Sequence, residues 1–225
     1  MSRLSWFQPI LNLVVSGRCA LCKRTAAIAF CQDCERQLHQ CQLDAPHACW
    51  QGELPMLAWG RYEGTLKRAI ATLKYENHPE LAQPLGRLAA SPWQRVPKQT
   101  GAAARRKLLV VPIPIHAEKR QQRGFNQAEL LAAAFCRATG LPLATQGLQR
   151  IKATTAQFGL SVSAREHNMT GAFAVGPTFK RPMRNTEILL FDDIYTTGST
   201  ARAAATTLRQ EGLTVAGIVA IAKAF

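Results

Sequence analysis

The chain has 225 residues, 47% of them hydrophobic, which is enough for a packed core and excludes a disordered protein. Its 28 Lys and Arg exceed its 14 Asp and Glu, and the net charge of +14 either favours polyanionic partners or serves solubility alone. No apolar run reaches the roughly 18–20 residues that span a bilayer, so we expect no membrane span.

The N-terminal segment MSRLSWFQPILNLVVSGRC carries one early Arg and an apolar patch, as a secretory signal peptide does. Polar residues and a proline interrupt the patch, and no small-x-small cleavage site follows it. We therefore expect an amphipathic docking helix at this end and a cytoplasmic protein.

Six of the seven cysteines lie near the N-terminus. Cys19-Ala-Leu-Cys22 and Cys31-Gln-Asp-Cys34 form a paired C-x-x-C array, and four thiolates at this spacing satisfy tetrahedral Zn²⁺. The array predicts a small zinc-ribbon-like module within residues 1–56. An iron–sulfur cluster is a minor alternative, and four free thiols are the reading without a metal.

A second metal site in the same region would have to use His39, Cys41, His47 and Cys49. These residues form no further C-x-x-C pair, and an isolated Cys or His usually packs without a metal. We expect one metal site and leave the second open. Cys136 lies in a predicted helix and reads as a core residue.

Residues 64–91 carry apolar residues at helical spacing, with a break near Asn77-His78-Pro79, and predict two helices. Residues 91–107 contain Pro, Gly and charge without an apolar period, as a linker does. We assign 57–107 to a helical segment and linker between the cysteine module and the remainder of the chain.

Residues 108–225 alternate apolar runs with amphipathic segments. The runs are typical of strands that are buried on both faces, and the segments are typical of helices. This order predicts an α/β domain with a parallel sheet and helices on its faces. The expected strands are 108–111, 187–191 and 215–222, and the expected helices are 125–139 and 199–211.

The segment ILLFDDIYTTGST, residues 188–200, runs from a predicted strand into two carboxylates, Asp192 and Asp193. Ligands of open parallel sheets bind beyond the carboxyl ends of the strands. The following loop enters the N-terminus of a helix, which favours a phosphate. Two acids above such a cradle suit a ribose phosphate: the acids accept from the ribose hydroxyls while the loop holds the 5′-phosphate. The residues of the cradle are Thr196, Thr197, Gly198, Ser199 and Thr200.

Other interpretations explain these residues less well. A Walker B strand also ends in Asp, but its partner G-x-x-x-x-G-K-[ST] is absent from the chain, and no G-x-G-x-x-G follows a strand. A purely structural turn would place two mutually repelling acids side by side without any compensating interaction.

ILLFDDIYTTGST resembles the 13-residue signature of type I phosphoribosyltransferases, which bind 5-phosphoribosyl 1-pyrophosphate (PRPP). Tyr195 departs from the signature, which has an aliphatic residue beside the ribose at this position. VVPIPIHAEKRQQRGFNQAELLA (110–132) and RIKATTAQFGLSVSAREHNMTGAF (150–173), with the paired cysteines, resemble the competence-associated ComF/GntX family over nearly the whole chain.

The resemblance implies a type I phosphoribosyltransferase-like fold with a pyrophosphate loop after the 108–111 strand. Its basic residues are Lys119, Arg120 and Arg123, which would bind the pyrophosphate. In the alternative interpretation, these side chains are simply solvated or touch nucleic acid. Mg²⁺ would bridge the pyrophosphate and ribose oxygens of PRPP. A hood over the site is implied at Arg150, Thr154, Gln157, Arg165 and Asn168. Ser163 with Glu166 also reads as a capping box, so that part of this segment starts a short helix.

Two functions follow. In a transferase, a nitrogen nucleophile would displace pyrophosphate from C1 of the ribose, with Asp192 and Asp193 orienting the sugar and stabilising the developing charge. No segment identifies an acceptor base, so PRPP binding without turnover stays open. The family resemblance implies a role in natural competence, on incoming single-stranded DNA and with a helicase-like partner. The basic stretch 95–123 and the aromatic residues Trp93 and Phe125 fit nucleic-acid contact.

Overall fold

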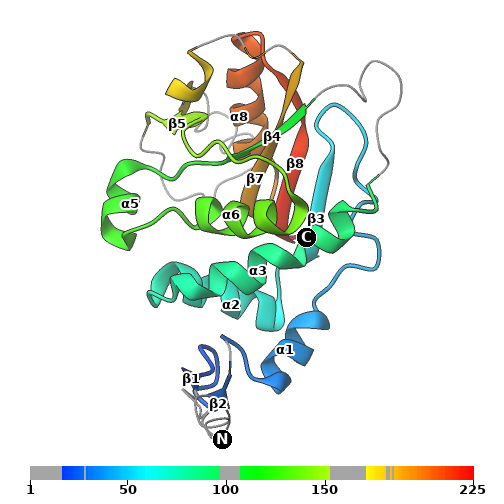
Figure 1. Ribbon diagram of the computed structural model, residues 1–225, viewed down its shortest axis with the longest axis vertical. Helices are drawn as coiled ribbons and strands as arrows, with labels where there is room; N and C mark the ends of the chain where they lie inside the picture. Colours follow the sequence, from blue (N-terminus) through cyan, green and yellow to red (C-terminus); the bar gives the residue numbers. More distant parts are fainter. Residues whose placement is uncertain (1–16, 28, 97–106, 153–170, 181–182, 184) are drawn as a thin grey trace, which may run out of the picture.

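A four-stranded parallel sheet forms the centre of the protein (Figure 1). The computed structural model describes residues 17–27, 29–96, 107–152, 171–180, 183 and 185–225. The strand order is β3-β8-β7-β4. The strands are β3 (Met56–Arg61), β4 (Lys107–Pro112), β7 (Thr186–Tyr195) and β8 (Thr214–Lys223). The predicted α/β class with a parallel sheet and flanking helices is confirmed.

Each face of the sheet is covered by a separate apolar layer. Along β7, Leu189 and Phe191 pack with one core cluster, whereas Ile188 and Leu190 pack with the other. This alternation across the sheet explains why the strand reads as one continuous apolar run.

Among the described residues, four helices pack on the first face and one helix packs on the second. On the first face these are α2 (Gly64–Tyr75), α3 (Ala82–Leu88), α4 (Ala90–Trp93) and α6 (Gln127–Thr139), with the short 3₁₀ turn η1 (Pro79–Leu81) between α2 and α3. On the second face α8 (Ser199–Gln210) packs beside the antiparallel pair β5 (Leu148–Arg150) and β6 (Phe173–Val175).

The predicted helix boundaries agree closely with the structure. The break expected near residues 77–79 is present, since α2 ends at Tyr75 and Asn77 has a positive φ of 55°. At the start of α6 the Asn126 side chain accepts a hydrogen bond from the Ala128 amide, as an N-cap does. Gly140 ends the same helix in the left-handed conformation.

Strand β3 was not predicted. Residues 57–107 were assigned to a helical segment and linker, but Met56–Arg61 pairs with β8 in parallel register and its first five residues are buried. The sheet therefore draws on both sides of the boundary proposed at residue 108. The short segment 117–123, predicted as a loop, is the helix α5 (Ala117–Arg123), and η3 (Pro177–Phe179) adds a further 3₁₀ turn.

The N-terminal module consists of the two-stranded ribbon β1 (Gly17–Arg18) and β2 (Thr25–Ala26), followed by α1 (Gln32–His39). It docks on the start of α2, where Thr65 Oγ1 donates to Gln37 Oε1 at 3.2 Å. The predicted N-terminal docking helix lies in residues 1–16, outside the described residues. Among the helices that the structure describes, none is long and apolar enough to cross a bilayer.

Candidate functional site

The two signature acids lie inside β7, near its carboxyl end, because the strand continues to Tyr195. Asp193 is only 4% exposed, and Asp192 is half-buried. The backbone N–H of Asp193 donates to Asp192 Oδ1 at 2.8 Å. The two carboxyls therefore occupy different environments, although they are neighbours in sequence.

Asp193 is held by two side chains that sequence analysis missed. Its Oδ2 forms an ion pair with Lys74 Nζ, at the end of α2, and its Oδ1 accepts from Gln127 Nε2 of α6 at 3.3 Å. One signal in the sequence pointed to Lys74. It follows Leu66 and Ile70 at a spacing of four residues and so falls on the buried stripe of α2, where a charge needs a partner.

The pKa values of the acids move in opposite directions. Burial raises the pKa of Asp193, but the charge of Lys74 and the hydrogen bonds to the carboxylate outweigh burial and hold it below its usual value. Burial, together with the charge of Asp193, raises the pKa of Asp192 well above its usual value. Asp193 is thus the ionised partner of Lys74, and Asp192 is the acid with the higher proton affinity.

The predicted phosphate cradle is assembled at the N-terminus of α8. Thr197 Oγ1 lies 3.2 Å from Ser199 Oγ and accepts from the Ser199 amide at 3.5 Å. Arg202 donates to the Thr197 carbonyl at 2.9 Å and fixes the loop from within the helix. Gly198 has φ +77° immediately before the helix. The loop therefore combines short hydroxyls with the free amides of a helix start, which is a setting for an anion.

The Tyr195 side chain packs against this loop. A Cβ added to Gly198 would overlap the Tyr195 hydroxyl and would lie 2.9 Å from Arg202 Nη1. The phenol thus packs against the Gly198 backbone, and its ring joins the apolar layer beneath α8. Gly198 is needed both for its positive φ and to make room for this ring.

Lys119 interacts electrostatically with three other cations, and two of these, Lys74 and Arg150, also interact with the acid pair. Desolvation and the positive charges of Arg150, Arg123 and Lys74 lower the pKa of Lys119 on α5. Burial lowers the pKa of Arg150 at the end of β5, against the opposing charge of Asp192. We call Lys74, Lys119, Arg123 and Arg150 the cation cluster.

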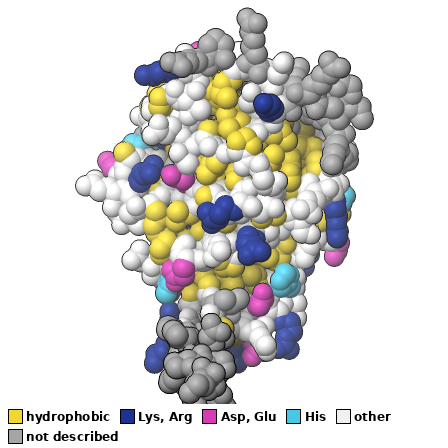
Figure 2. All heavy atoms as spheres, viewed as in Figure 1, with side chains coloured by type: hydrophobic (Ala, Val, Ile, Leu, Met, Phe, Trp, Pro, Cys, Tyr) yellow, Lys and Arg dark blue, Asp and Glu magenta, His cyan; other side chains and the backbone are white. Residues whose placement is uncertain are grey.

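Arg120, the third basic residue predicted for the pyrophosphate, has an acidic partner outside this cluster. Arg120 Nη2 lies 3.4 Å from Glu129 Oε2 of α6, so this guanidinium is paired with a carboxylate. Of the hood, only Arg150 is described; Thr154, Gln157, Arg165 and Asn168 lie outside the described residues, as do Lys98, Arg105 and Arg106. On the face drawn in Figure 2, the described Lys and Arg side chains do not merge into one basic surface.

The aromatic residues expected to stack bases pack against the core. The ring of Trp93 meets those of Trp50 and Phe135 edge to face, at centroid distances of 5.2 and 6.0 Å. Phe125 is half-buried against the same core cluster. Both rings therefore have a packing role in the fold, and stacking of a base on them stays a prediction.

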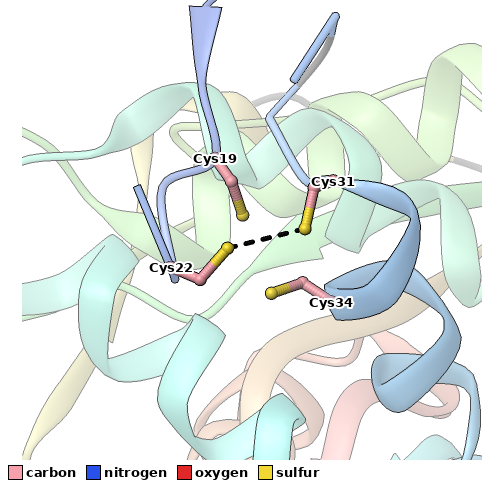
Figure 3. Close-up of side chains that lie close together, drawn as sticks. All are labelled: Cys19, Cys22, Cys31 and Cys34. Carbon is pink, nitrogen blue, oxygen red and sulfur yellow. Dashed lines mark hydrogen bonds between the residues drawn. The ribbon is translucent and has the colours of Figure 1, made fainter. Parts of the chain in front are cut away.

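The second candidate site is the cysteine cluster (Figure 3). The Sγ atoms of Cys19, Cys22, Cys31 and Cys34 all lie within 4.8 Å of one another, and they point toward a shared space between the β1–β2 ribbon and α1. Zn–S bonds of about 2.3 Å would put the sulfurs of a tetrahedral site roughly 3.8 Å apart. The predicted four-cysteine arrangement is therefore present and fits a metal ion such as zinc.

The surroundings favour the thiolate form at one of these positions. Arg24 Nε donates to Cys22 Sγ at 3.4 Å, and this contact lowers the Cys22 pKa to about 6. Burial raises the pKa of Cys34 to about 12, and Arg68 of α2 donates to its Sγ at 4.0 Å. A buried thiol in a group of four is typical of a structural metal site, where the ion would keep it deprotonated.

The structure does not bring the second set of possible ligands together. The His39 ring lies edge-on to Trp59 at 5.9 Å, Cys41 Sγ donates to the carbonyls of Gln37 and Glu63, and Lys223 Nζ lies 3.8 Å from Cys49 Sγ. Within the described ranges, the four-cysteine group is the one cluster of three or more His, Cys, Asp or Glu that is tight enough for a metal. The described geometry thus offers no second metal site at His39, Cys41, His47 and Cys49.

Comparison with known proteins agrees with the motifs. No family model matches the chain. DNA utilization protein YhgH of Salmonella typhimurium is 28% identical over 219 residues, which cover 89% of this chain and 94% of that protein. Competence protein F of Haemophilus influenzae is 28% identical over 223 residues, covering 95% and 93%. Competence protein ComFC of Bacillus subtilis is 24% identical over 210 residues, covering 90% and 75%. The resemblance to the ComF family is confirmed along most of the chain.

Proposed function

We propose that the protein is a ComF-like, cytoplasmic, PRPP-binding protein that acts on incoming single-stranded DNA in natural competence. The relatives support the coarser part of this proposal, because they are named for competence and DNA utilization and align with most of the chain. The assignment of PRPP and single-stranded DNA as ligands rests on the chemistry of the site.

One observation carries the PRPP assignment. A hydroxyl-rich loop at a helix N-terminus directly follows the two acids. Lys119 of α5 interacts with the charges of Lys74, Arg123 and Arg150, and Lys74 and Arg150 interact with the charge of Asp192. PRPP carries one phosphate, two ribose hydroxyls and a pyrophosphate. The loop suits the first, Asp192 suits the hydroxyls, and the cation cluster suits the pyrophosphate.

Both metals in the proposal follow from donor chemistry. Mg²⁺ prefers oxygen ligands and would enter with the pyrophosphate of PRPP, near the carboxylate of Asp192. Zn²⁺ suits the four thiols and would fix the N-terminal module, which is too small to fold on apolar burial alone. The module then serves contact with a partner or with nucleic acid rather than chemistry.

The alternative is an active phosphoribosyltransferase of nucleotide metabolism. It would use the same loop, acids and cation cluster, and it would add a nitrogenous acceptor base. In that reaction the base nitrogen bonds to C1 of the ribose as the C1–O bond to pyrophosphate breaks, so that pyrophosphate leaves with the bonding electrons.

A titration with PRPP and Mg²⁺, with and without single-stranded DNA, tests the proposal. We expect saturable PRPP binding, saturable DNA binding, and no pyrophosphate release from PRPP with DNA present. Ribose 5-phosphate is the matched ligand control, since it lacks the pyrophosphate and should bind more weakly. Release of pyrophosphate with a free nucleobase would favour the transferase, and a parent protein that binds neither ligand would overturn both functions.

A further inference from the structure

Tyr75 is an exposed aromatic residue next to Lys74, which is largely buried. It is the last residue of α2, and its side chain is 76% exposed, whereas Lys74 immediately before it is sequestered against Asp193. Of the large apolar or aromatic side chains that the structure describes, the exposed ones are Tyr75, Ile151, Met183 and Phe225. An exposed ring contributes little to the stability of the fold, so stability does not explain its position.

Arg123 lies over this ring and connects it, through Gln127, to the acid pair. The guanidinium carbon lies 5.4 Å from the Tyr75 ring centroid, and the same guanidinium donates to Gln127 Oε1. Gln127 in turn donates to Asp193 Oδ1 at 3.3 Å. The ring is thus backed by a cation that is tied to the signature acid, and most of its surface remains open to solvent.

This pairing has the chemistry of a base-stacking platform. A planar ring with a guanidinium behind it offers both π-stacking and a cation–π contribution to a nucleobase. The cation cluster beside it can neutralise the phosphates that flank such a base. Trp93 and Phe125 are less accessible than Tyr75, since both are half-buried against the core.

The openness of the platform distinguishes between two sources of a base. Sites for small molecules usually enclose most of the ligand, and a residue that is 76% exposed does not form such an enclosure. A base within a strand needs no enclosure, because its neighbours and their phosphates hold it in place. A strand fits this surface better than a free base does.

We propose that Tyr75, backed by Arg123, is a stacking site for a base of single-stranded nucleic acid beside the acid pair. The inference rests on the proposed function in one respect, that single-stranded DNA is a partner. It adds where a base of that strand lies and which side chain receives it.

The probe is a single-stranded oligonucleotide that carries one 2-aminopurine, a base whose fluorescence is quenched when it stacks. Its binding is measured with the full-length parent and with the Tyr75→Ala and Tyr75→Phe variants. Tyr75→Ala should weaken binding roughly 5- to 150-fold, as the loss of one stacked base predicts, and should abolish the quenching. Tyr75→Phe keeps the ring and should restore both. The matched control is Phe225→Ala, which removes another exposed aromatic ring that lies under a cation, Lys223, and should leave binding unchanged.

The salt dependence separates stacking from charge. Tyr75→Ala should leave the slope of log affinity against log salt unchanged, because the ring contacts no phosphate, whereas Arg123→Ala should reduce its magnitude by about 0.7 if the guanidinium also neutralises one phosphate. Parent binding with full affinity and quenching retained in Tyr75→Ala would overturn the stacking site and leave the proposed function standing. A parent that binds PRPP but no single-stranded DNA would remove the DNA partner and the stacking site together. Free 2-aminopurine riboside that binds as tightly as the oligonucleotide, and loses binding in Tyr75→Ala, would contradict the choice of a strand.

Discussion

Lys74 and Asp193 form an ion pair that is almost wholly withdrawn from water, with 14% and 6% of their side chains exposed. The lysine comes from α2, which follows the N-terminal module, and the aspartate comes from the signature in β7. A helix outside the predicted phosphoribosyltransferase-like domain thus neutralises one of the two acids, and Asp192 is the acid that the proposed function assigns to the ribose hydroxyls.

Breaking this pair should destabilise the protein. Asp193→Asn leaves the Lys74 ammonium buried without its counter-charge, and Lys74→Met does the same to the carboxylate. Each single change should cost about 3–5 kcal/mol in free energy of unfolding. The double variant removes both charges and should recover most of that loss. Denaturant unfolding of the three variants measures the cycle, and single variants within about 0.5 kcal/mol of the parent would show that the pair is not closed in solution.

The pair also predicts a dependence of stability on pH. Asp193 has a lowered pKa, so its contribution is present above the unfolded value of about 4 and is lost as the pH falls through the folded value. Lys74 has a raised pKa, so its contribution is present below the unfolded value of about 10.4 and is lost as the pH rises through the folded value.

The stability difference between the paired and the uncharged protein should therefore be largest between about pH 5 and 9 and should shrink at both extremes. The comparison is best made in an Asp192→Asn background, where the second acid does not titrate, with Lys74→Met/Asp193→Asn as the uncharged partner. Melting temperatures across the pH range provide the measurement. A difference that does not vary with pH would be incompatible with this assignment of charges.

Gly198 and Tyr195 should behave as a coupled pair. Gly198→Ala imposes a left-handed penalty of about 1–2 kcal/mol, and overlap with the Tyr195 hydroxyl adds about 1–3 kcal/mol. Adding Tyr195→Val removes the overlap but not the backbone penalty, so it should rescue part of the loss. Thermal unfolding of the two single variants and the double variant gives the coupling. Strict additivity would mean that the phenol does not pack under the loop.

The cysteine cluster should hold one zinc ion per chain. Elemental analysis of the purified protein should give one equivalent, and Cys34→Ser should lose it and unfold the N-terminal module, because the metal supplies the folding energy of so small a unit. Cys49→Ser is the matched control, since Cys49 is exposed and outside the cluster. An N-terminal module that stays folded without metal would count against a structural site.

Local patterns in the sequence were enough to predict β7, α8 and the four cysteines. Each of these features can be recognised from a few consecutive residues: a strand buried on both faces, a glycine before a helix, and paired C-x-x-C knuckles. The apolar run of β3 is short and reaches Gly60 and Arg61, so it was not recognised without its partner β8.

Contacts between segments that are distant in the chain were harder to predict from the sequence. Arg120 and Arg123 look alike in sequence, but the turn of α5 pairs Arg120 with Glu129 and directs Arg123 toward Tyr75 and Gln127. Lys74 could have been noticed as a charge on a buried stripe, but its partner could not have been named. The sequence identifies which residues have side chains that could bind a ligand or form an ion pair, and tertiary packing decides which of them come into contact.

Calorimetry with PRPP and Mg²⁺ tests the PRPP-binding site most directly, with Arg123→Ala and Arg120→Ala as a matched pair on one helix. The parent should bind. Arg123→Ala should weaken binding about 10- to 150-fold, as expected for the loss of a charged hydrogen bond to phosphate, and Arg120→Ala, whose guanidinium is directed to Glu129, should bind like the parent. A parent protein that shows no PRPP binding, or an Arg120 variant impaired as much as the Arg123 variant, would contradict a pyrophosphate site built on the cation cluster.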